Sequence, residues 1–408
     1  MKTVALAGTF DSKGIEYAYV KKIIEDLGLK TFTIHMGVFP PTFTPDVSNA
    51  EVAAAAGVDI KDLAAKKDRA WATEVLSKGM EKLVPELYRQ GKFDGILAFG
   101  GSGGTSLATP AMRALPIGVP KVMVSTVASG NVSQYVGTSD IVMMPSVVDV
   151  SGLNSISTKI FTNAAFAIAG MVKFENKAVI EKKPLVAATM FGVTTPCVNF
   201  AREYLEARGY EVLTFHATGT GGRSMEDLVK AGFIEGVLDI TTTEWADEIV
   251  GGVLNAGPDR LDAAAKMGVP QVVSVGALDM VNFGPIDTIP EKFKGRNFYK
   301  HNPTVTLMRT TVEENVKLGK KIAEKLNQAK GYTVLMLPLA GVSMIDAPGQ
   351  AFYGKEEDEN LFNELRKGIN PKVVRLEEYN QHINDKEFAE KAAQNLIDMM
   401  NKKKSETK

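Results

Sequence analysis

The sequence predicts an α/β protein of two domains, each built on a doubly wound, mainly parallel β-sheet. The chain has 408 residues, which is more than one hydrophobic core usually supports, so two domains of about 200 residues each are expected. Near its start, a strand, a glycine-containing loop, an amphipathic helix and a second strand follow one another. The same order of elements returns in the second half.

The first unit begins with an apolar strand at residues 4–7, which leads through the loop Gly8–Gly14 into a helix. Four apolar residues after the loop recur at helical spacing, and we expect them to form the buried face of this helix. They are Ile15, Tyr19, Ile23 and Leu27. Gly28 is expected to end the helix before a strand at 31–34. A βαβ unit of this kind builds parallel sheets that are covered by helices.

The second half repeats this order, with a strand from residue 185, a loop at 191–196, a helix, and a strand that ends at His216. Three pairs keep a constant separation: Gly28 and Gly209, Thr33 and Thr214, His35 and His216. This recurrence indicates two similar domains. We place the boundary near residue 180, within a charged segment at 177–183, which gives domains of residues 1–180 and 181–408. Residues 42–66 are predicted as an insertion with one or two helices.

The composition favours a cytoplasmic protein that binds a small molecule. Lys and Arg number 47 and Asp and Glu 48, so no basic surface indicates nucleic acid or an anionic membrane as a partner. The only cysteine, Cys197, excludes an internal disulfide and suits a reducing compartment. No apolar run reaches the ~18 residues that span a bilayer.

Glycine-rich loops after strands are the predicted binding sites, because ligands of open parallel sheets bind beyond the carboxyl ends of the strands. The strongest candidate follows the strand at 96–98 and consists of Gly100, Gly101, Ser102, Gly103, Gly104 and Thr105. Its glycines let an anion approach the backbone, and the N-terminus of the following helix favours negative charge. The loop is neither a Walker A loop nor a dinucleotide fingerprint. It is expected to bind phosphate or a carboxylate, with a flexible turn as the alternative.

Three further segments of the first half are expected beside this loop. Asp11 and Lys13 follow the first strand and can supply a metal contact and a positive charge, although a plain helix-capping loop is equally consistent. A third strand at 122–124 is followed by Ser129, Gly130 and Asn131, which offer a hydroxyl and an amide. Asp149 can bind ribose or a metal, while capping a helix is the commoner role of such an acid.

The second half holds a richer polar set at its predicted strand ends and in a loop-rich span. The set comprises His216, Gly219, Gly221, Gly222, Asp279, Asn282, His301 and Arg309. If these residues converge, Arg309 and the glycines hold an anion, and a histidine moves a proton. Asp279 then orients the base or holds a metal. Satisfied polar histidines are the alternative, and no spacing typical of a metal site is present, so no metal ligand is assigned.

Several segments of the sequence, taken together, resemble the ATP-binding domain family of the tomato mosaic virus resistance protein. The bacterial and fungal members of that family form a largely uncharacterised protein family. The segments are Gly100–Thr105, His216–Gly222, Ala256–Arg260, Gly276–Gly284 and His301–Thr311. The resemblance implies two Rossmann-like domains, self-association, and binding of ATP with Mg²⁺. It carries the nucleotide phosphates onto Gly100–Thr105 and implies no catalytic residue.

Two functional hypotheses follow. The first is an ATP-binding protein whose glycine-rich loop cradles the phosphates near an interdomain cleft. The second is an enzyme of hydrolase or lyase type that acts on a small phosphorylated or carboxylated metabolite, with His216, His301 and Asp279 as its catalytic residues. In both, the expected partner is a phosphorylated small molecule, and the protein is expected to be a homo-oligomer that binds neither nucleic acid nor membranes.

Overall fold

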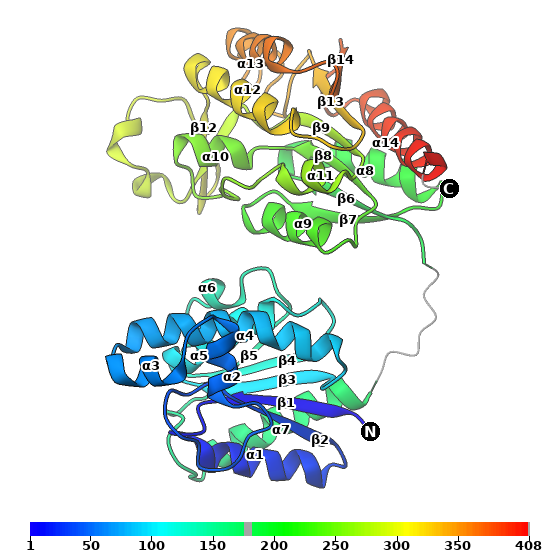
Figure 1. Ribbon diagram of the computed structural model, residues 1–408. Coiled ribbons are helices and arrows are strands. Elements are labelled where there is room, and N and C mark those ends of the chain that lie inside the picture. Colours follow the sequence, from blue (N-terminus) through cyan, green and yellow to red (C-terminus); the bar gives the residue numbers. More distant parts are fainter. Residues whose placement is uncertain (175–181, 407–408) are drawn as a thin grey trace. The chain divides into compact units, whose positions relative to one another are not determined.

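The computed structural model describes residues 1–174 and 182–406 of the chain. Its contacts divide the chain into two units, Met1–Val179 and Ile180–Lys408. Part of the charged segment predicted to join the domains, residues 177–181, lies outside the described residues. Each unit contains a sheet of parallel strands with helices on both faces (Figure 1). The α/β class with two doubly wound sheets is confirmed.

The sheet of the first unit has five parallel strands in the order β2-β1-β3-β4-β5. They are β1 (Thr3–Gly8), β2 (Lys30–His35), β3 (Gly95–Gly100), β4 (Lys121–Ser125) and β5 (Val142–Pro145). The strand order reverses direction between β1 and β3. In open α/β sheets such a switch point is where ligands bind, because the loops on either side of it diverge and leave a crevice.

Helices cover both faces of this sheet, and alternate residues of β1 enter the two cores. The helices are α1 (Gly14–Asp26), α2 (Asn49–Ala55), α3 (Ile60–Lys66), α4 (Arg69–Arg89), α5 (Ser102–Arg113), α6 (Ser133–Val136) and α7 (Ser157–Lys173). Val4 and Leu6 pack beneath α1 and α7, whereas Ala5 and Ala7 pack beneath α2, α4 and α5 (Figure 1). Helices α2 and α3 form the insertion predicted at 42–66.

The predicted buried face of α1 is only partly correct, because Tyr19, Ile23 and Leu27 are half-buried and pack against the core, but Ile15 does not. Ile15 is 68% exposed, and the helix instead buries Tyr17, Val20 and Ile24. Tyr17 determines this orientation, because its ring stacks on Phe99 with 3.7 Å between centroids and its hydroxyl donates to the Ala7 carbonyl at 2.6 Å. The helix is therefore rotated so that a hydrogen-bonding aromatic side chain, rather than the most apolar one, lies on the sheet.

The second unit has a six-stranded sheet in the order β7-β6-β8-β9-β13-β14. Its strands are β6 (Leu185–Met190), β7 (Glu211–His216), β8 (Gly236–Thr241), β9 (Gln271–Gly276), β13 (Thr333–Pro338) and β14 (Val374–Tyr379). Counted along its own sequence, its first five parallel strands follow the same 2-1-3-4-5 order as those of the first unit. The recurrence of elements in the sequence therefore corresponds to a recurrence of topology.

A small antiparallel sheet accompanies the second unit. Its strands are β10 (Met280–Phe283), β11 (Phe298–Asn302) and β12 (Val305–Arg309). We predicted a loop-rich span here, and this was wrong. Strand β12 pairs with a strand on each side, Met280 lying opposite Arg309 and Phe298 opposite Met308. The β10–β12 pairing joins segments that are separated in the sequence, so the local composition did not reveal it, whereas β11 and β12 are neighbours joined by residues 303–304.

Helices α8 and α14 cover one face of the large sheet, and the other helices pack on the opposite face (Figure 1). The helices are α8 (Thr195–Glu206), α9 (Thr220–Lys230), α10 (Glu244–Val250), α11 (Asp262–Met267), α12 (Val312–Leu326), α13 (Lys355–Gly368) and α14 (Lys386–Glu406), with single 3-10 turns η1 (Gly192–Thr194), η2 (Ile286–Thr288) and η3 (Glu291–Phe293). Across the described residues of both units, none of the helices combines the length and apolar character needed to cross a membrane.

Candidate functional site

A cavity of about 640 Å³ lies in the first unit at the carboxyl ends of β1 and β3, at the switch point of the sheet. Its walls come from the loop after β1, the residues that follow β2, the start of α5, helix α3 of the insertion, and helix α4 that follows the insertion. Among the predicted residues, Asp11, Lys13, Asp149 and Gly101–Gly104 line this cavity. The structure thus brings the two loops of the first half together.

Three predicted positions differ from this set. Thr105 is fully buried and its hydroxyl lies 2.6 Å from that of Ser125, so it ties α5 to β4 instead of facing a ligand. Gly100 ends β3, where a Cβ would lie 3.1 Å from the Cα of Gly104. The turn Ser129–Asn131 after β4 does not belong to the lining of this cavity.

The glycine-rich segment forms the first turn of α5. Strand β3 ends at Gly100, Gly101 is the N-cap, and the 12-residue helix starts at Ser102. Among the described residues, no side chain accepts a hydrogen bond from the amides of Ser102, Gly103 or Gly104, and the N-cap Gly101 has no side chain that could cap them. The first amides of any helix lack partners within it and carry the positive end of its dipole. The amides of Ser102, Gly103 and Gly104 are therefore available to an anion in the cavity.

Positive side chains surround this helix start. Lys13 lines the cavity and donates from Nζ to the carbonyl of Val150. The Nη2 atom of Arg69 lies 3.4 Å from the position that a Cβ on Gly103 would take. Lys67, Asp68 and Arg69, at the start of α4, also line the cavity. The sequence analysis missed these three, because charged residues ahead of a helix are usually solvated and only the tertiary fold brings α4 beside α5.

Asp11 is held in place by backbone beyond β2. Its Oδ2 accepts a hydrogen bond from the amide of Phe39 at 3.0 Å. A Cβ on Gly37 would lie 2.5 Å from Oδ1 of Asp11, so only glycine admits the carboxylate there. His35 steadies both loops: its Nδ1 accepts from the Phe10 amide at 3.1 Å, and its Nε2 lies 2.8 Å from the Phe39 carbonyl. Since Nδ1 accepts, Nε2 carries the proton and donates to that carbonyl.

The glycine-rich segment of the second unit is already occupied by an internal carboxylate. Oε1 of Glu244 accepts from the amides of Gly219 and Gly222, at 2.7 and 3.1 Å, at the start of α9. A Cβ on Gly222 would overlap this carboxylate, and one on Gly221 would overlap the His216 carbonyl. These glycines were predicted to bind a ligand; in the structure they allow close internal packing.

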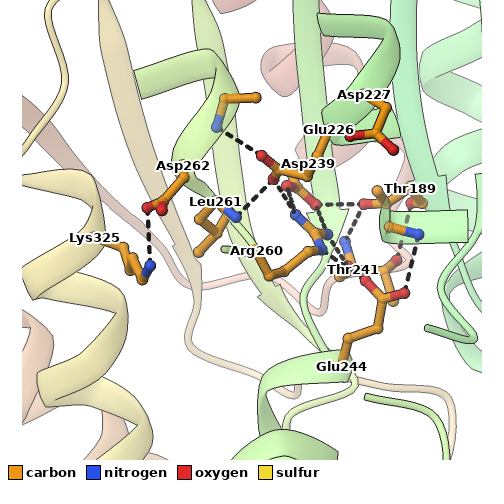
Figure 2. Close-up of polar contacts among 12 residues, drawn as sticks. Thr189, Glu226, Asp227, Asp239, Thr241, Glu244, Arg260, Leu261, Asp262 and Lys325 are labelled. Atoms are coloured by element: carbon orange, nitrogen blue, oxygen red, sulfur yellow. Dashed lines mark hydrogen bonds and ion pairs between the residues drawn. The ribbon is translucent and has the colours of Figure 1, made fainter. Parts of the chain in front are cut away.

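Glu244 belongs to a buried network around Arg260 (Figure 2). Arg260 is 1% exposed, and it donates to Oε2 of Glu244 at 2.6 Å and to both oxygens of Asp239 at 2.5 and 2.7 Å. Glu226 lies 3.6 Å from the same guanidinium and accepts from the amides of Leu261 and Ala263. Burial raises the pKa of Glu226 despite the nearby Arg260. Arg260 lies in one of the segments that carry the family resemblance, but no sequence pattern indicated its partners.

The predicted residues Asp279, Asn282 and Arg309 are buried and bonded within the protein. Asp279 accepts from the Ser343 hydroxyl at 2.7 Å, and burial raises its pKa to about 7. Arg309 donates to the carbonyl of Phe352 at 2.8 Å and to Asp358 at 2.8 Å. Asn282 donates from Nδ2 to Asp247 at 2.6 Å. These contacts tie the small antiparallel sheet to its neighbours.

The two predicted catalytic histidines are exposed. His216 ends β7, with its ring centroid 5.4 Å from that of Phe191, and His301 lies on β11. Within residues 1–174 and 182–406, no hydrogen bond joins either histidine to Asp279. The same residues contain no group of three His, Cys, Asp or Glu side chains placed to hold a metal ion. The structure therefore does not assemble the acid–base set predicted for the second half.

Comparisons with known proteins match both units. The N-terminal domain model of the uncharacterised protein family UPF0261 matches residues 2–177, and its C-terminal domain model matches residues 183–400. A UPF0261 protein of Clostridium tetani is 58% identical over 402 residues, which cover 98% of this chain and all of that protein. The ToMV resistance protein Tm-1(GCR237) of Solanum lycopersicum is 49% identical over 337 residues, 81% of this chain but 45% of that protein.

A solved UDP-N-acetylglucosamine 2-epimerase from Rickettsia bellii matches 67% of this chain and 78% of its own, with 11% identity and a TM-score of 0.21. This likeness is too low to inform on function.

Proposed function

Because this chain belongs to the uncharacterised protein family UPF0261 through both of its domains, and that description names no ligand, we propose a function from the site itself. The first domain binds a phosphorylated small molecule, with ATP as the leading candidate. The observation that carries the proposal is the uncapped, glycine-rich start of α5, which lines a cavity at the switch point of the sheet. Backbone amides and a helix dipole are a common binding site for phosphate.

A comparison with the second domain supports an anion as the ligand at the start of α5. There, the amides of a glycine-rich helix start are satisfied by the carboxylate of Glu244. No side chain among the described residues takes this place on α5, so in our proposal the negative group on its amides comes from a ligand. Lys13 and Arg69 add positive charge at the same place.

The cavity is large enough for a nucleotide, since small-molecule sites commonly measure about 300–1,000 Å³. Its walls include the apolar side chains of Met36, Leu63 and Leu107, which suit a base better than a bare phosphate. Mg²⁺ that accompanies ATP is held mainly by phosphate oxygens and water. The exposed carboxylate of Asp149 on the cavity wall is the protein group that fits it.

An enzyme built on the second-domain polar set has weaker support. The glycine amides there have an internal acceptor, and Arg309 is used in contacts with Phe352 and Asp358. We therefore retain ligand binding by the first domain as the proposed function.

The test is calorimetric titration of the full chain with ATP and Mg²⁺. In Gly103→Asp, the new carboxylate lies at the helix start beside Arg69, so we expect ATP affinity to fall at least ~10-fold, about 1.4 kcal/mol. Gly170→Asp is the matched control, because a Cβ at Gly170 on α7 meets no atom within 4 Å. Equal affinities of the folded Gly103→Asp variant and the wild type would contradict the proposal.

A further inference from the structure

One oxygen of Asp11 is left without a hydrogen-bond partner at the edge of the cavity. Oδ2 is engaged by the Phe39 amide, whereas Oδ1 is buried and has no partner among the described residues. An unsatisfied buried acceptor costs about 1–3 kcal/mol, and more when it is charged. Such an atom in a binding cavity indicates a group that a ligand supplies.

We propose that Oδ1 of Asp11 accepts a hydrogen bond from a sugar hydroxyl of the ligand, so that the site selects phosphorylated sugars and nucleosides over simple polyphosphates. This inference rests on the proposed function, because it concerns the same cavity. In addition to the phosphate contacts at the start of α5, the hydrogen bond to Oδ1 gives the site a second contact, through which the protein recognises the uncharged sugar of the ligand.

The charges around the cavity support separate contacts for the phosphates and for the sugar of the ligand. A carboxylate repels phosphate, so Asp11 is unfavourable in a site for inorganic anions alone. The neighbouring cations do not neutralise it: Lys13 donates to the Val150 carbonyl, and the guanidinium of Arg69 lies beside Gly103. A carboxylate accepts hydrogen bonds and donates none when ionised, and a hydroxyl is the donor that a phosphorylated sugar offers.

The position of the carboxylate fits this role. Asp11 comes from the loop after β1, but its side chain lies against Gly37 and Phe39, just beyond the end of β2. In nucleotide-binding sheets of this class, an acidic group beyond the second strand binds ribose hydroxyls while the phosphates lie on a helix start. Here, a carboxylate reaches the same place from the preceding loop.

A divalent cation is the competing partner for Oδ1. Such an ion normally needs several oxygen ligands, and no metal-holding group of three His, Cys, Asp or Glu occurs in the part of the chain that the structure describes. A ligand hydroxyl needs only Oδ1 as its acceptor, whereas a cation would need further oxygen ligands. We therefore assign Oδ1 to a hydroxyl.

The experiment compares ATP, 2′,3′-dideoxy-ATP and tripolyphosphate by calorimetry on the full chain. The wild type should bind ATP at least ~10-fold more tightly than the dideoxy nucleotide, as one hydrogen bond to a charged group is worth about 1.5–3 kcal/mol. In Asp11→Asn, the amide oxygen can still accept from Phe39 while the NH₂ group takes the place of the unpartnered oxygen. We expect this variant to lose the preference for ATP and to bind tripolyphosphate as tightly as the wild type or more tightly.

Asp68→Asn is the matched control, because it removes the same charge from the cavity wall and Asn still caps α4. It should keep the preference for ATP. The inference is overturned if Asp11→Asn weakens ATP and dideoxy-ATP equally, if the wild type does not discriminate between them, or if the discrimination disappears in EDTA, which would assign Oδ1 to a metal. If neither ATP nor tripolyphosphate binds the wild type, the proposed function fails as well.

Discussion

At the scale of single residues, the second domain depends on buried charges that compensate one another. Arg260 is the cation shared by Asp239, Glu244 and the more distant Glu226, all of them buried. Each carboxylate also accepts hydrogen bonds from amides or a hydroxyl, as Glu244 does from Gly219 and Gly222. Removing the cation leaves its partners charged and without compensation in a medium that solvates them poorly.

Arg260→Met should therefore destabilise the protein by about 3–5 kcal/mol, the usual cost of breaking a buried ion pair by removing one partner. The measurement is urea unfolding followed by circular dichroism. Arg223→Met, at an exposed position of α9, should change stability by less than ~0.5 kcal/mol. A loss below ~1 kcal/mol in Arg260→Met would show that the network contributes little.

A second buried acid makes stability depend on pH. Burial raises the pKa of Asp247 to about 7, although hydrogen bonds from Asn282 oppose the shift. The folded-state pKa then lies above the value of about 3.9 in the unfolded chain. The folded state binds the proton more tightly, so this contribution is fully present below about pH 4 and is lost as the pH rises through 7.

We expect the melting temperature to fall less between pH 6 and pH 8 in Asp247→Asn than in the wild type. The substitution can be accommodated, because Oδ1 of Asn282 has no partner in the part of the chain that the structure describes, and a flip of this amide lets it accept from the new NH₂ group. Scanning calorimetry at both pH values gives the difference. Asp287→Asn, in the exposed turn η2, should keep the wild-type slope, and identical slopes in all three proteins would rule out the assignment.

At the scale of elements, helices α5 and α9 show two ways of satisfying a glycine-rich helix start. Helix α9 takes the carboxylate of Glu244, whereas α5 has no side-chain cap. Sequence patterns predicted both helix starts, because strand, glycine cluster and helix are local features. They did not distinguish the start of α9, which Glu244 occupies, from the start of α5, since Glu244 belongs to a different helix, α10.

Gly222→Ala tests the filled site. A Cβ at this position would overlap the carboxylate of Glu244, so the carboxylate has to leave the amides of α9 and the side of Arg260. We expect a loss of at least ~2 kcal/mol in unfolding free energy, although alanine usually stabilises a helix relative to glycine. In Gly192→Ala, where a Cβ meets no atom within 4 Å, stability should change by under ~1 kcal/mol. Equal stabilities would mean that Glu244 is dispensable.

At the scale of the whole molecule, the sequence predicted two similar doubly wound domains, because strands, helices and glycine stops recur in step. The structure adds that the two sheets share one order over their first five strands. The candidate cavity was predicted in part. Asp11, Lys13 and Gly101–Gly104 follow strands, where parallel sheets bind ligands, whereas Arg69 comes from the start of α4, whose packing beside α5 only the tertiary fold determines. For the same reason, Asp279 and Arg309 were predicted as active-site groups, although the fold buries both.

The carboxylate of Glu244 on α9 also affects how the two repeats respond to the solution around them. A tethered group competes with free anions at an effective concentration that reaches the millimolar range even for flexible links and is higher when the fold positions the group. Millimolar phosphate in a cell or a buffer therefore does not displace it. The helix start of the second repeat thus keeps its internal carboxylate, and the response to ligand supply that follows from our proposal belongs to the open helix start of the first repeat.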